Sequence, residues 1–234
     1  MKPLIITLDG PSGSGKSTAS VRLAKYFKIP CLDTGAMYRT VAYKATEANI
    51  PLDDSPALSK LASKLTFKFG FDGDSRWVEV LDNGSNMRMG KEIRTPEVSL
   101  AASKIAKLPK VREVLVRKQQ EIGRKDGAVV EGRDAGTVIF PHATIKFFVT
   151  ASAEERAKRR HKELVDSYGI KAQDYGEVLK EILLRDRQDE EREASPSKPA
   201  DDALIIDTSN LDFEKVVQFL KEKVESRLQT RAAR

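Results

Sequence analysis

The 234-residue sequence contains a single cysteine, Cys31, and no long hydrophobic run. One cysteine excludes a disulfide framework or a multi-cysteine metal site within the chain, and its apolar neighbours predict a buried structural thiol. No apolar stretch approaches the roughly 20 residues that cross a bilayer. The N-terminal apolar run is short and ends at Asp9-Gly10-Pro11, which is untypical of a signal peptide. These absences predict a cytoplasmic protein that does not bind membranes.

Positive charge is in excess, but it does not form one continuous basic tract. The net charge of +6 and the isoelectric point near 9.3 suit either nucleic acid or phosphorylated small molecules as partners. The arginines occur in short clusters, mixed with acidic residues, inside segments that have helix or strand patterns. This distribution favours small phosphorylated substrates, so we expect no nucleic-acid partner. We also expect a monomer.

The strongest motif is a glycine-rich loop at residues 10–17. It fits G-x-x-x-x-G-K-[ST], follows the apolar run 4–8 and precedes a predicted helix at 18–27. Glycines allow backbone N–H groups to approach phosphate oxygens, Lys16 can reach the β- and γ-phosphates, and the Ser17 hydroxyl suits Mg²⁺. The loop therefore predicts ATP binding with Mg²⁺. The residues predicted to bind the nucleotide here are Gly10, Pro11, Ser12, Gly13, Ser14, Gly15, Lys16, Ser17 and Thr18.

The rest of the pattern predicts an α/β fold in which helices flank a parallel β-sheet. Apolar, β-branched runs at 29–32, 128–131, 144–149 and 203–206 alternate with helical segments. Residues 65–90 instead alternate with period two and contain the turn Asp82-Asn83-Gly84, which predicts a small antiparallel insert. Trp77 suits the core of this insert better than a base-stacking platform. Helices are predicted at 40–48, 53–64, 97–106, 109–124, 174–193 and 212–228, with a frayed tail at 229–234.

Charged residues follow two of the predicted strands, at the sheet edge where ligands bind in α/β folds. After the strand at 29–32, Asp33 could bind Mg²⁺ through water and Arg39 could hold a second phosphate. The alternatives are a helix N-cap for Asp33 and a surface position for Arg39. Arg133 and Asp134 follow the strand at 128–131, with a structural ion pair as the alternative.

Tyr168-Gly169-Ile170 joins two predicted helices that carry arginines, the first with Arg156 and Arg160 and the second at 174–193. This arrangement is similar to a hinged lid. The simpler interpretation is that the charged residues form helix faces exposed to solvent. In the second helix, Arg185, Asp189 and Arg192 share one face. Arginines outside the phosphate loop suit transfer between two phosphates, because guanidinium groups offset the repulsion between them. An acceptor phosphate is largely dianionic at neutral pH, since its second pKa is ~6, so no general base is required.

Five stretches, together with the insert, resemble the bacterial cytidylate kinases, a family of P-loop nucleoside monophosphate kinases. The stretches are residues 10–17, 33–39, 93–98, 132–137 and 185–189. The resemblance implies in-line phosphoryl transfer from ATP to CMP and dCMP, giving CDP and dCDP, with Mg²⁺. It also implies a core with the phosphate loop at 1–34, a monophosphate-binding region at 35–125, core strands at 126–152, lid helices at 153–194, and a last core strand and helix at 195–234.

The resemblance also implies roles for individual residues. Ser103, Arg112 and Asp134 would face the cytosine, because they can satisfy its N4 amino group and its N3 and O2 acceptors. Arg39, Arg133 and Arg192 would hold the acceptor phosphate. Arg185 and Asp189 would lie on the sugar side, and Arg156 and Arg160 over the donor phosphates. The acceptor-binding set is Thr34, Arg39, Ser103, Arg112, Arg133, Asp134, Arg185, Asp189 and Arg192. The catalytic set is Lys16, Arg39, Arg133, Asp134 and Arg192.

Departures from the family pattern are small, and two other functions stay open. Thr34 stands where the family often has Ser, and Gln188 stands where a charged residue is common. The chain could instead be a kinase for another nucleoside monophosphate, or for a small-molecule hydroxyl with Asp134 or Asp33 as base. It could also be a nucleotide-dependent switch or RNA-binding ATPase whose basic clusters contact backbone phosphates.

Overall fold

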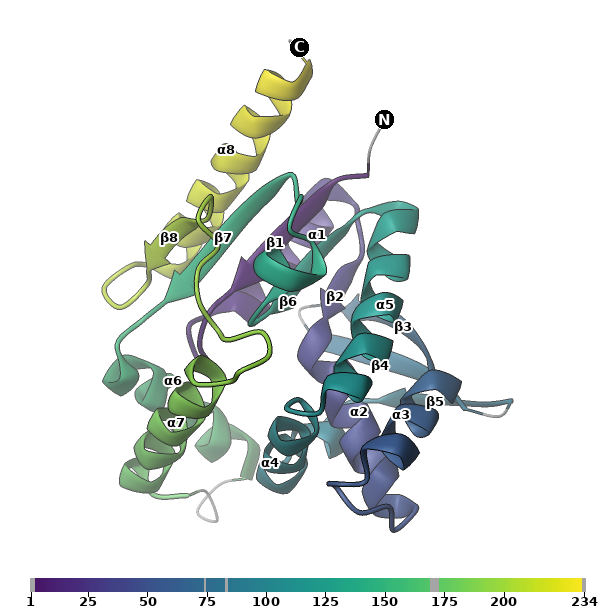
Figure 1. The fold of residues 1–234 in the computed structure, drawn as a ribbon. Helices are drawn as coiled ribbons and strands as arrows, with labels where there is room; N and C mark the ends of the chain where they lie inside the picture. The colour runs from purple at the N-terminus through teal and green to yellow at the C-terminus, as the bar shows by residue number, and fades with distance from the viewer. Residues whose placement is uncertain (1–2, 74, 83, 169–172, 233–234) are drawn as a thin grey trace. The chain divides into compact units, whose positions relative to one another are not determined.

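The structure is a computed structural model that describes residues 3–73, 75–82, 84–168 and 173–232. It divides into two compact units. Unit 1 consists of Met1–Ile5 and Ala24–Gly132, and unit 2 consists of Ile6–Leu23 and Arg133–Arg234. The chain therefore passes from unit 1 into unit 2 twice, once before the phosphate loop and once at Arg133 (Figure 1).

Unit 1 is built on two parallel strands, β2 (Cys31–Asp33) and β6 (Ala128–Gly132), which place Asp33 opposite Glu131. Both strands are completely buried, as their apolar sequences predict. The helices are α2 (Thr34–Glu47), α3 (Ser55–Lys64), α4 (Pro96–Ile105) and α5 (Pro109–Asp126), with a 3₁₀ turn η1 at Glu92–Arg94. Helix α2 contacts α4 and helix α3 contacts α5. The fully buried core includes Leu32, Met37, Leu58, Ile105 and Leu115.

The predicted antiparallel insert is confirmed. It is formed by β3 (Thr66–Asp72), β4 (Ser75–Asp82) and β5 (Ser85–Met89), in the order β3-β4-β5. Trp77 lies half-buried between Gly70 and Arg88: a side chain at Gly70 would overlap the indole ring, and the Arg88 guanidinium lies 4.3 Å from the ring centroid. The prediction that Trp77 belongs to the core of the insert is wrong, because the buried face carries Val78 and Val80 and successive residues of a strand point to opposite faces. Asn83 of the predicted turn lies outside the described residues.

Unit 2 contains β1 (Ile5–Asp9) from its second residue onward, β7 (Ile145–Thr150) and β8 (Leu204–Asp207). Strand β7 pairs in parallel with both others, so the five strands of the two units that were predicted to be parallel are confirmed as such. The unit also holds the start of α1 (Lys16–Phe27), the π-helical turn η2 (Ala135–Ile139), and helices α6 (Ala153–Tyr168), α7 (Tyr175–Glu190) and α8 (Phe213–Ala232).

Helices α6 and α7 lie side by side, as Figure 1 shows. Ala157 and Leu164 of α6 pack with Val178 and Ile182 of α7 in one buried cluster. These apolar side chains of each helix are therefore covered by the other helix. The hinge predicted at Gly169-Ile170 lies outside the described residues.

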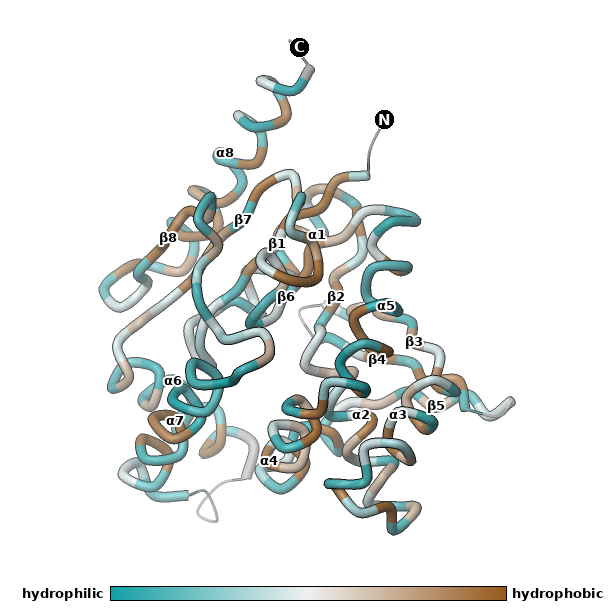
Figure 2. Tube along the Cα trace, in the orientation of Figure 1, coloured by the Kyte–Doolittle hydropathy of each residue, from teal (hydrophilic) through white to brown (hydrophobic). Residues whose placement is uncertain are grey.

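Two predicted element boundaries are wrong. Helix α2 begins at Thr34 and not at residue 40, because Asp33 caps it by accepting a hydrogen bond from the Ala36 N–H at 2.9 Å. Helix α8 continues to Ala232 where a frayed tail was predicted. The Arg231 guanidinium donates to Thr144 Oγ1 at 2.8 Å and anchors this last turn. Figure 2 shows hydrophobic and hydrophilic residues alternating along α8, as expected for a helix with one covered face.

Within the described part of the chain, we find no helix that combines the length and the apolar character needed to span a membrane.

Candidate active site

The glycine-rich loop connects β1 to α1 in unit 2, and two of its glycines are required by close packing. Gly10 has a φ of +136°, and a side chain there would overlap the carbonyl oxygen of Val149 in β7. Gly13 has a φ of +78°, and its Cβ would lie 3.0 Å from the Cβ of Arg156 in α6. The loop is therefore pressed against both elements, in a conformation that other residues rarely adopt.

Lys16 starts α1 and is only 3% exposed. Its ammonium group donates to the Pro11 carbonyl and to Ser14 Oγ, which is 3.2 Å away. Thr208, at the end of β8, holds the same loop by donating from Oγ1 to the Ser14 carbonyl at 3.2 Å. An ammonium group held in place by loop oxygens is positioned to bind an anion, which is what a phosphate-binding lysine requires.

Arg156 connects the loop to helix α7. Its guanidinium donates to the Ser12 carbonyl at 3.3 Å and pairs with Asp186 of α7 at 2.7 Å. The side chain is 6% exposed, so it belongs to the interior of unit 2. Arg160 behaves differently, because it pairs with Glu163 one turn along α6 and is about one-third exposed. Of the two arginines predicted over the donor phosphates, the structure brings Arg156 to the loop.

Asp189 of α7 organises a group of arginines that we call the Asp189 cluster: Asp189, Arg133, Arg185 and Arg192. Arg133 Nε donates to Asp189 Oδ2 at 2.8 Å, and Arg192 pairs with Oδ1 at 2.9 Å. Burial raises the pKa of Asp189, but Arg133, Arg192 and Arg185 outweigh it, so the pKa is lowered. Two guanidinium groups are bonded to one carboxylate and a third acts on it electrostatically, and guanidinium groups in such a cluster suit a phosphate.

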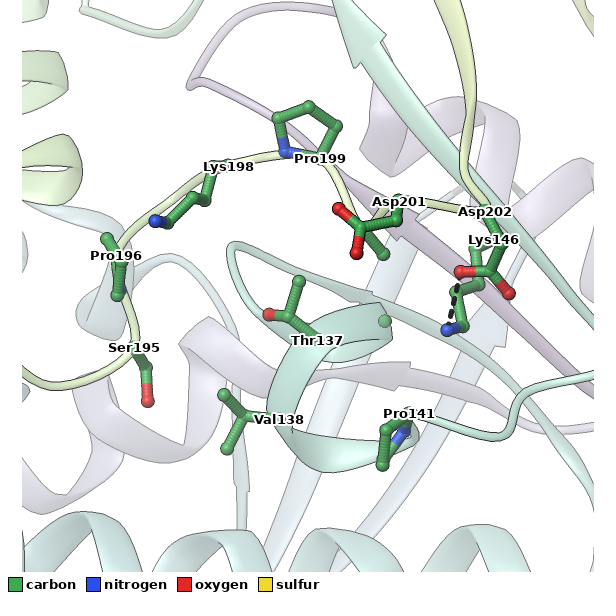
Figure 3. A pocket seen from close by; sticks show the side chains of 12 residues that line it. Thr137, Val138, Pro141, Lys146, Ser195, Pro196, Lys198, Pro199, Asp201 and Asp202 are labelled. Atoms are coloured by element: carbon green, nitrogen blue, oxygen red, sulfur yellow. Dashed lines mark hydrogen bonds and ion pairs between the residues drawn. The ribbon is translucent and has the colours of Figure 1, made fainter.

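A cavity of about 120 Å³ lies between the loop and this cluster. Its lining includes Pro11 of the loop, Arg156, Asp186 and Asp189. A larger cavity of about 530 Å³ has no loop residue in its lining and is closed on one side by residues 195–202. Figure 3 shows this larger cavity, with Lys146 and Asp202 joined by an ion pair of 2.7 Å at its edge. A choice of site by cavity volume alone would therefore select the larger cavity, which lacks the phosphate-loop residues.

Unit 1 contains a second group of the same kind, the Asp33 cluster: Asp33, Arg39, Arg76, Arg94 and Glu131. Arg39 lies 3.0 Å from Asp33, Arg76 3.4 Å and Arg94 3.6 Å, and Arg76 also pairs with Glu131. Burial raises the pKa of Asp33, but these three arginines reverse its effect and lower the pKa. Burial lowers the pKa of Arg76, but Glu131 and Asp33 raise it above its ordinary value. Three arginines against two carboxylates again leave positive charge, which favours an anion.

The two residues predicted to bind Mg²⁺, Ser17 and Asp33, have different surroundings. Among the described residues, no group of three or more His, Cys, Asp or Glu side chains is arranged to hold a metal ion. The guanidinium groups around Asp33 make a further cation an unfavourable neighbour, so its metal role stays a prediction only. Ser17 is half-buried at the start of α1 and offers one hydroxyl. This donor set fits Mg²⁺ that is held chiefly by phosphate oxygens of a nucleotide.

Of the three residues predicted to face the base, Ser103 and Arg112 occupy helices of unit 1 and Asp134 belongs to unit 2. Arg112, in the first turn of α5, is 5% exposed, donates to the Ala106 carbonyl at 3.2 Å and lies 5.8 Å from the centroid of the Tyr38 ring. Ser103 is half-buried in α4. Thr34 Oγ1 donates to the Glu131 carbonyl at 2.8 Å and so joins α2 to β6. Asp134 precedes η2 in unit 2 and is buried.

Several residues that build these sites were missed by the sequence analysis. Asp9, Arg76, Glu131 and Asp186 have partners that are close in space and distant in sequence. Asp9 had one usable signal, since it is an acidic residue that ends a buried strand directly before the loop. Cys31 was correctly predicted as a buried thiol, and burial raises its pKa to about 12.

Replacing Arg76 by Ala should destabilise the protein by about 3–5 kcal/mol. Glu131 would lose its buried arginine partner, and Asp33 would lose one of its three arginine partners. Urea unfolding measures the free energy directly. Arg88→Ala is the matched control in the same insert, since its ion pair with Asp72 is half-exposed and should change stability by about 1 kcal/mol or less. Equal effects of the two substitutions would contradict the role given to Arg76.

Comparison with known proteins gives one consistent result. The family model for cytidylate kinase matches residues 6–226. A cytidylate kinase of Pasteurella multocida (strain Pm70) is 44% identical over 230 residues, which cover 98% of each chain. A cytidylate kinase of Thermosipho africanus (strain TCF52B) is 46% identical over 222 residues, which cover 95% of each chain.

Among solved structures, an uncharacterized protein from Eubacterium ventriosum ATCC 27560 has a TM-score of 0.52 and 13% identity. The match covers 96% of this chain and 99% of that one. At this level of identity the likeness shows a shared fold and nothing about function.

Proposed function

The chain belongs to the cytidylate kinase family, and from this premise we propose that it transfers the γ-phosphoryl group of ATP to CMP and dCMP. The products are ADP and CDP or dCDP. The relatives that carry the name cytidylate kinase match almost the whole chain, so the proposal concerns the protein as a whole and not one segment of it.

One structural observation carries the proposal: Pro11 of the phosphate loop and Asp189, the carboxylate that holds Arg133 and Arg192, line the same small cavity. The loop alone accounts for a donor nucleotide. The arginines of the cluster lie outside the loop motif and are more than one triphosphate requires. A second phosphate at the cavity explains why both groups are present.

On the donor side, Lys16 and the loop N–H groups bind the ATP phosphates and Arg156 supports them from α6. Ser17 supplies a hydroxyl for Mg²⁺, with the remaining ligands coming from phosphate oxygens and water. The ion contributes charge neutralisation on the phosphates that Lys16 also contacts. Arg160 and Thr18 stay further candidates, both being at least partly exposed.

On the acceptor side, we assign the phosphate of CMP to Arg133, Arg192 and Arg39, the residues that the family resemblance implies. Arg133 and Arg192 are kept in place by Asp189, and Arg39 by Asp33, so their guanidinium planes are oriented before a substrate binds. This orientation lowers the entropy lost in reaching the reactive geometry. Asp189 is already bonded to two arginines, and Arg185 adds positive charge on the sugar side.

Base recognition depends on Asp134, Ser103 and Arg112. Asp134 and Ser103 accept from the N4 amino group of cytosine, and Arg112 donates to N3 or O2. Uracil has an acceptor at position 4 and a donor at position 3, so the same side chains would be left unpaired. We therefore propose selectivity for cytosine over uracil. Thr34 keeps the hydroxyl of the more common serine and supports this part of the site through Glu131.

We further propose that residues 35–125 act as a mobile monophosphate-binding region and residues 153–194 as a lid, around the core segments 1–34, 126–152 and 195–234. Closure of these parts would exclude water from the transferring phosphate. Catalysis then rests on positioning and on charge stabilisation, without a general base.

A panel of acceptors tests this function. Release of ADP should be stimulated by CMP and dCMP, with kcat/KM at least about 100-fold above the values for UMP and AMP. Similar rates with UMP or AMP would support a kinase for another monophosphate. A basal ATPase that responds to RNA and not to CMP would support the switch or RNA-binding alternative and contradict the proposal.

A further inference from the structure

Asp9, the last residue of β1, accepts two backbone hydrogen bonds from the segment that follows Asp134. Its Oδ1 accepts from the Ala135 N–H at 2.8 Å, and its Oδ2 accepts from the Gly136 N–H at 2.7 Å. The side chain is 4% exposed and lies directly before Gly10 of the phosphate loop. One carboxylate thus joins the start of the loop to the start of η2.

The turn η2 is too short to satisfy its own first N–H groups. Its internal bonds run from the N–H groups of Val138 and Ile139 to the Asp134 carbonyl, at 2.9 and 3.2 Å. Asp134 occupies the N-cap position, but its side chain does not cap the turn. The carboxylate of Asp9 does this instead, so the Asp134 carboxylate is not used for capping.

The contact between Asp9 and η2 is close and depends on a glycine. A Cβ on Gly136 would lie 2.9 Å from Thr7 Oγ1, 3.1 Å from Lys146 Cδ and 3.3 Å from Asp9 Oδ2. All three neighbours come from β1 or β7, two paired strands. The backbone of η2 can therefore rest on these strands only if residue 136 has no side chain.

Charged groups reach this contact from three elements. Asp134 precedes η2, Lys16 starts α1, and Lys146 of β7 has its ammonium paired with Asp202. Burial raises the pKa of Asp9 to about 6, although the two N–H donors and Lys16 act in the opposite direction. The carboxylate is therefore held at a site where its desolvation is unfavourable, although a serine or asparagine could cap a turn without burying a charge.

We propose that Asp9 is a positioning residue that fixes the Arg133-Asp134 segment against the phosphate loop and thereby sets the selectivity for cytosine. This inference rests on the proposed function, in which Asp134 contacts the base and Arg133 the acceptor phosphate. Asp9 itself touches neither substrate. Its effect passes through η2, because Ala135 and Gly136 follow Asp134 directly in the chain.

Asp9→Asn is the most conservative test. A carboxamide has one oxygen in place of two, so one of the two N–H groups would face an NH₂ donor and lose its acceptor. We expect the ratio of kcat/KM for CMP to kcat/KM for UMP to fall at least about tenfold. Affinity for ATP, measured by titration, should stay within about threefold, because the loop glycines and Lys16 keep their own contacts.

Gly136→Ala perturbs the same contact from the other side and does not alter Asp9. The added Cβ would push η2 away from Thr7 and Asp9, so the CMP to UMP ratio should fall in the same direction. If Asp9→Asn does not fold, the CMP to UMP ratio of Gly136→Ala tests the inference by itself. Asp54→Asn is the matched control, because Asp54 also accepts a backbone N–H, that of Ala57 at 2.9 Å, as the cap of α3. It should leave the ratio unchanged.

The outcomes separate the inference from the function. A wild-type protein without preference for CMP overturns the proposed function and, with it, this inference. A wild-type preference that persists unchanged in both variants overturns the inference alone. Equal losses with CMP and UMP, together with weakened ATP binding, also overturn it, because Asp9 would then act only on the phosphate loop.

Discussion

Replacement of Lys16 by Met should lower kcat for CMP phosphorylation by about 100- to 1000-fold. Its ammonium is buried at the phosphate loop and bonded to two neutral oxygens, so it is the loop's own full positive charge at this point. Met keeps the length of the side chain and removes only that charge. The loss should appear in kcat as well as in ATP affinity, because negative charge on the bridging oxygen grows as the γ-phosphate transfers.

Steady-state kinetics with ATP and CMP both varied measure this effect. Lys25→Met is the matched control in the same helix, since Lys25 is exposed in the last turn of α1 and should not change kcat. Lys16→Arg should not restore activity, because a planar guanidinium does not fit a site shaped for an ammonium. A Lys16→Met variant with normal kcat would contradict the role given to the loop.

Replacement of Arg133 by Ala should lower kcat/KM for CMP by about 1000-fold or more and leave ATP affinity within about threefold. Arg133 is held by Asp189, whose side chain lines the loop cavity, and neither residue belongs to the loop. Its removal takes away an oriented guanidinium from the acceptor side only. Asp189 would keep Arg192, so the fold should persist.

Kinetics and isothermal titration with ATP separate the two sides of the site for this variant. Arg133→Lys should recover little activity, because one ammonium cannot replace the two-pronged contact with phosphate. Arg187→Ala serves as the control on α7, since Arg187 is 75% exposed and pairs only with Glu191 in the next turn. Loss of ATP binding without loss of CMP turnover would contradict the assignment of Arg133.

The sequence allowed the local features of the molecule to be predicted, and the family resemblance supplied roles that local patterns cannot give. The phosphate loop is a contiguous motif between a strand and a helix, so its position and glycines could be predicted directly. The insert was equally clear, because period-two alternation and the pairing of Trp77 with Gly70 are local to residues 66–89. The role of Arg133 came from the resemblance, and its partner Asp189 lies 56 residues away.

The residues that were missed depend on contacts between distant segments. Asp9 and its partners Ala135 and Gly136 are separated by 126 and 127 residues, and Arg76 and Glu131 by 55. The sequence around Arg76 and Glu131 does not distinguish a buried charged residue from an exposed one, whereas Asp9 had the signal of its place between a buried strand and the loop. The start of α2 was missed for a local reason, since Gly35 has low helix propensity and the cap at Asp33 outweighs it.

The most direct test of the central claim is to follow the γ-phosphate of labelled ATP in the presence of the purified protein and CMP. The label should appear in CDP, in an amount equal to the ADP formed, and no label should leave ATP at a comparable rate when CMP is omitted. Label that appears as inorganic phosphate, with or without CMP, would show ATP hydrolysis in place of transfer and would contradict the account.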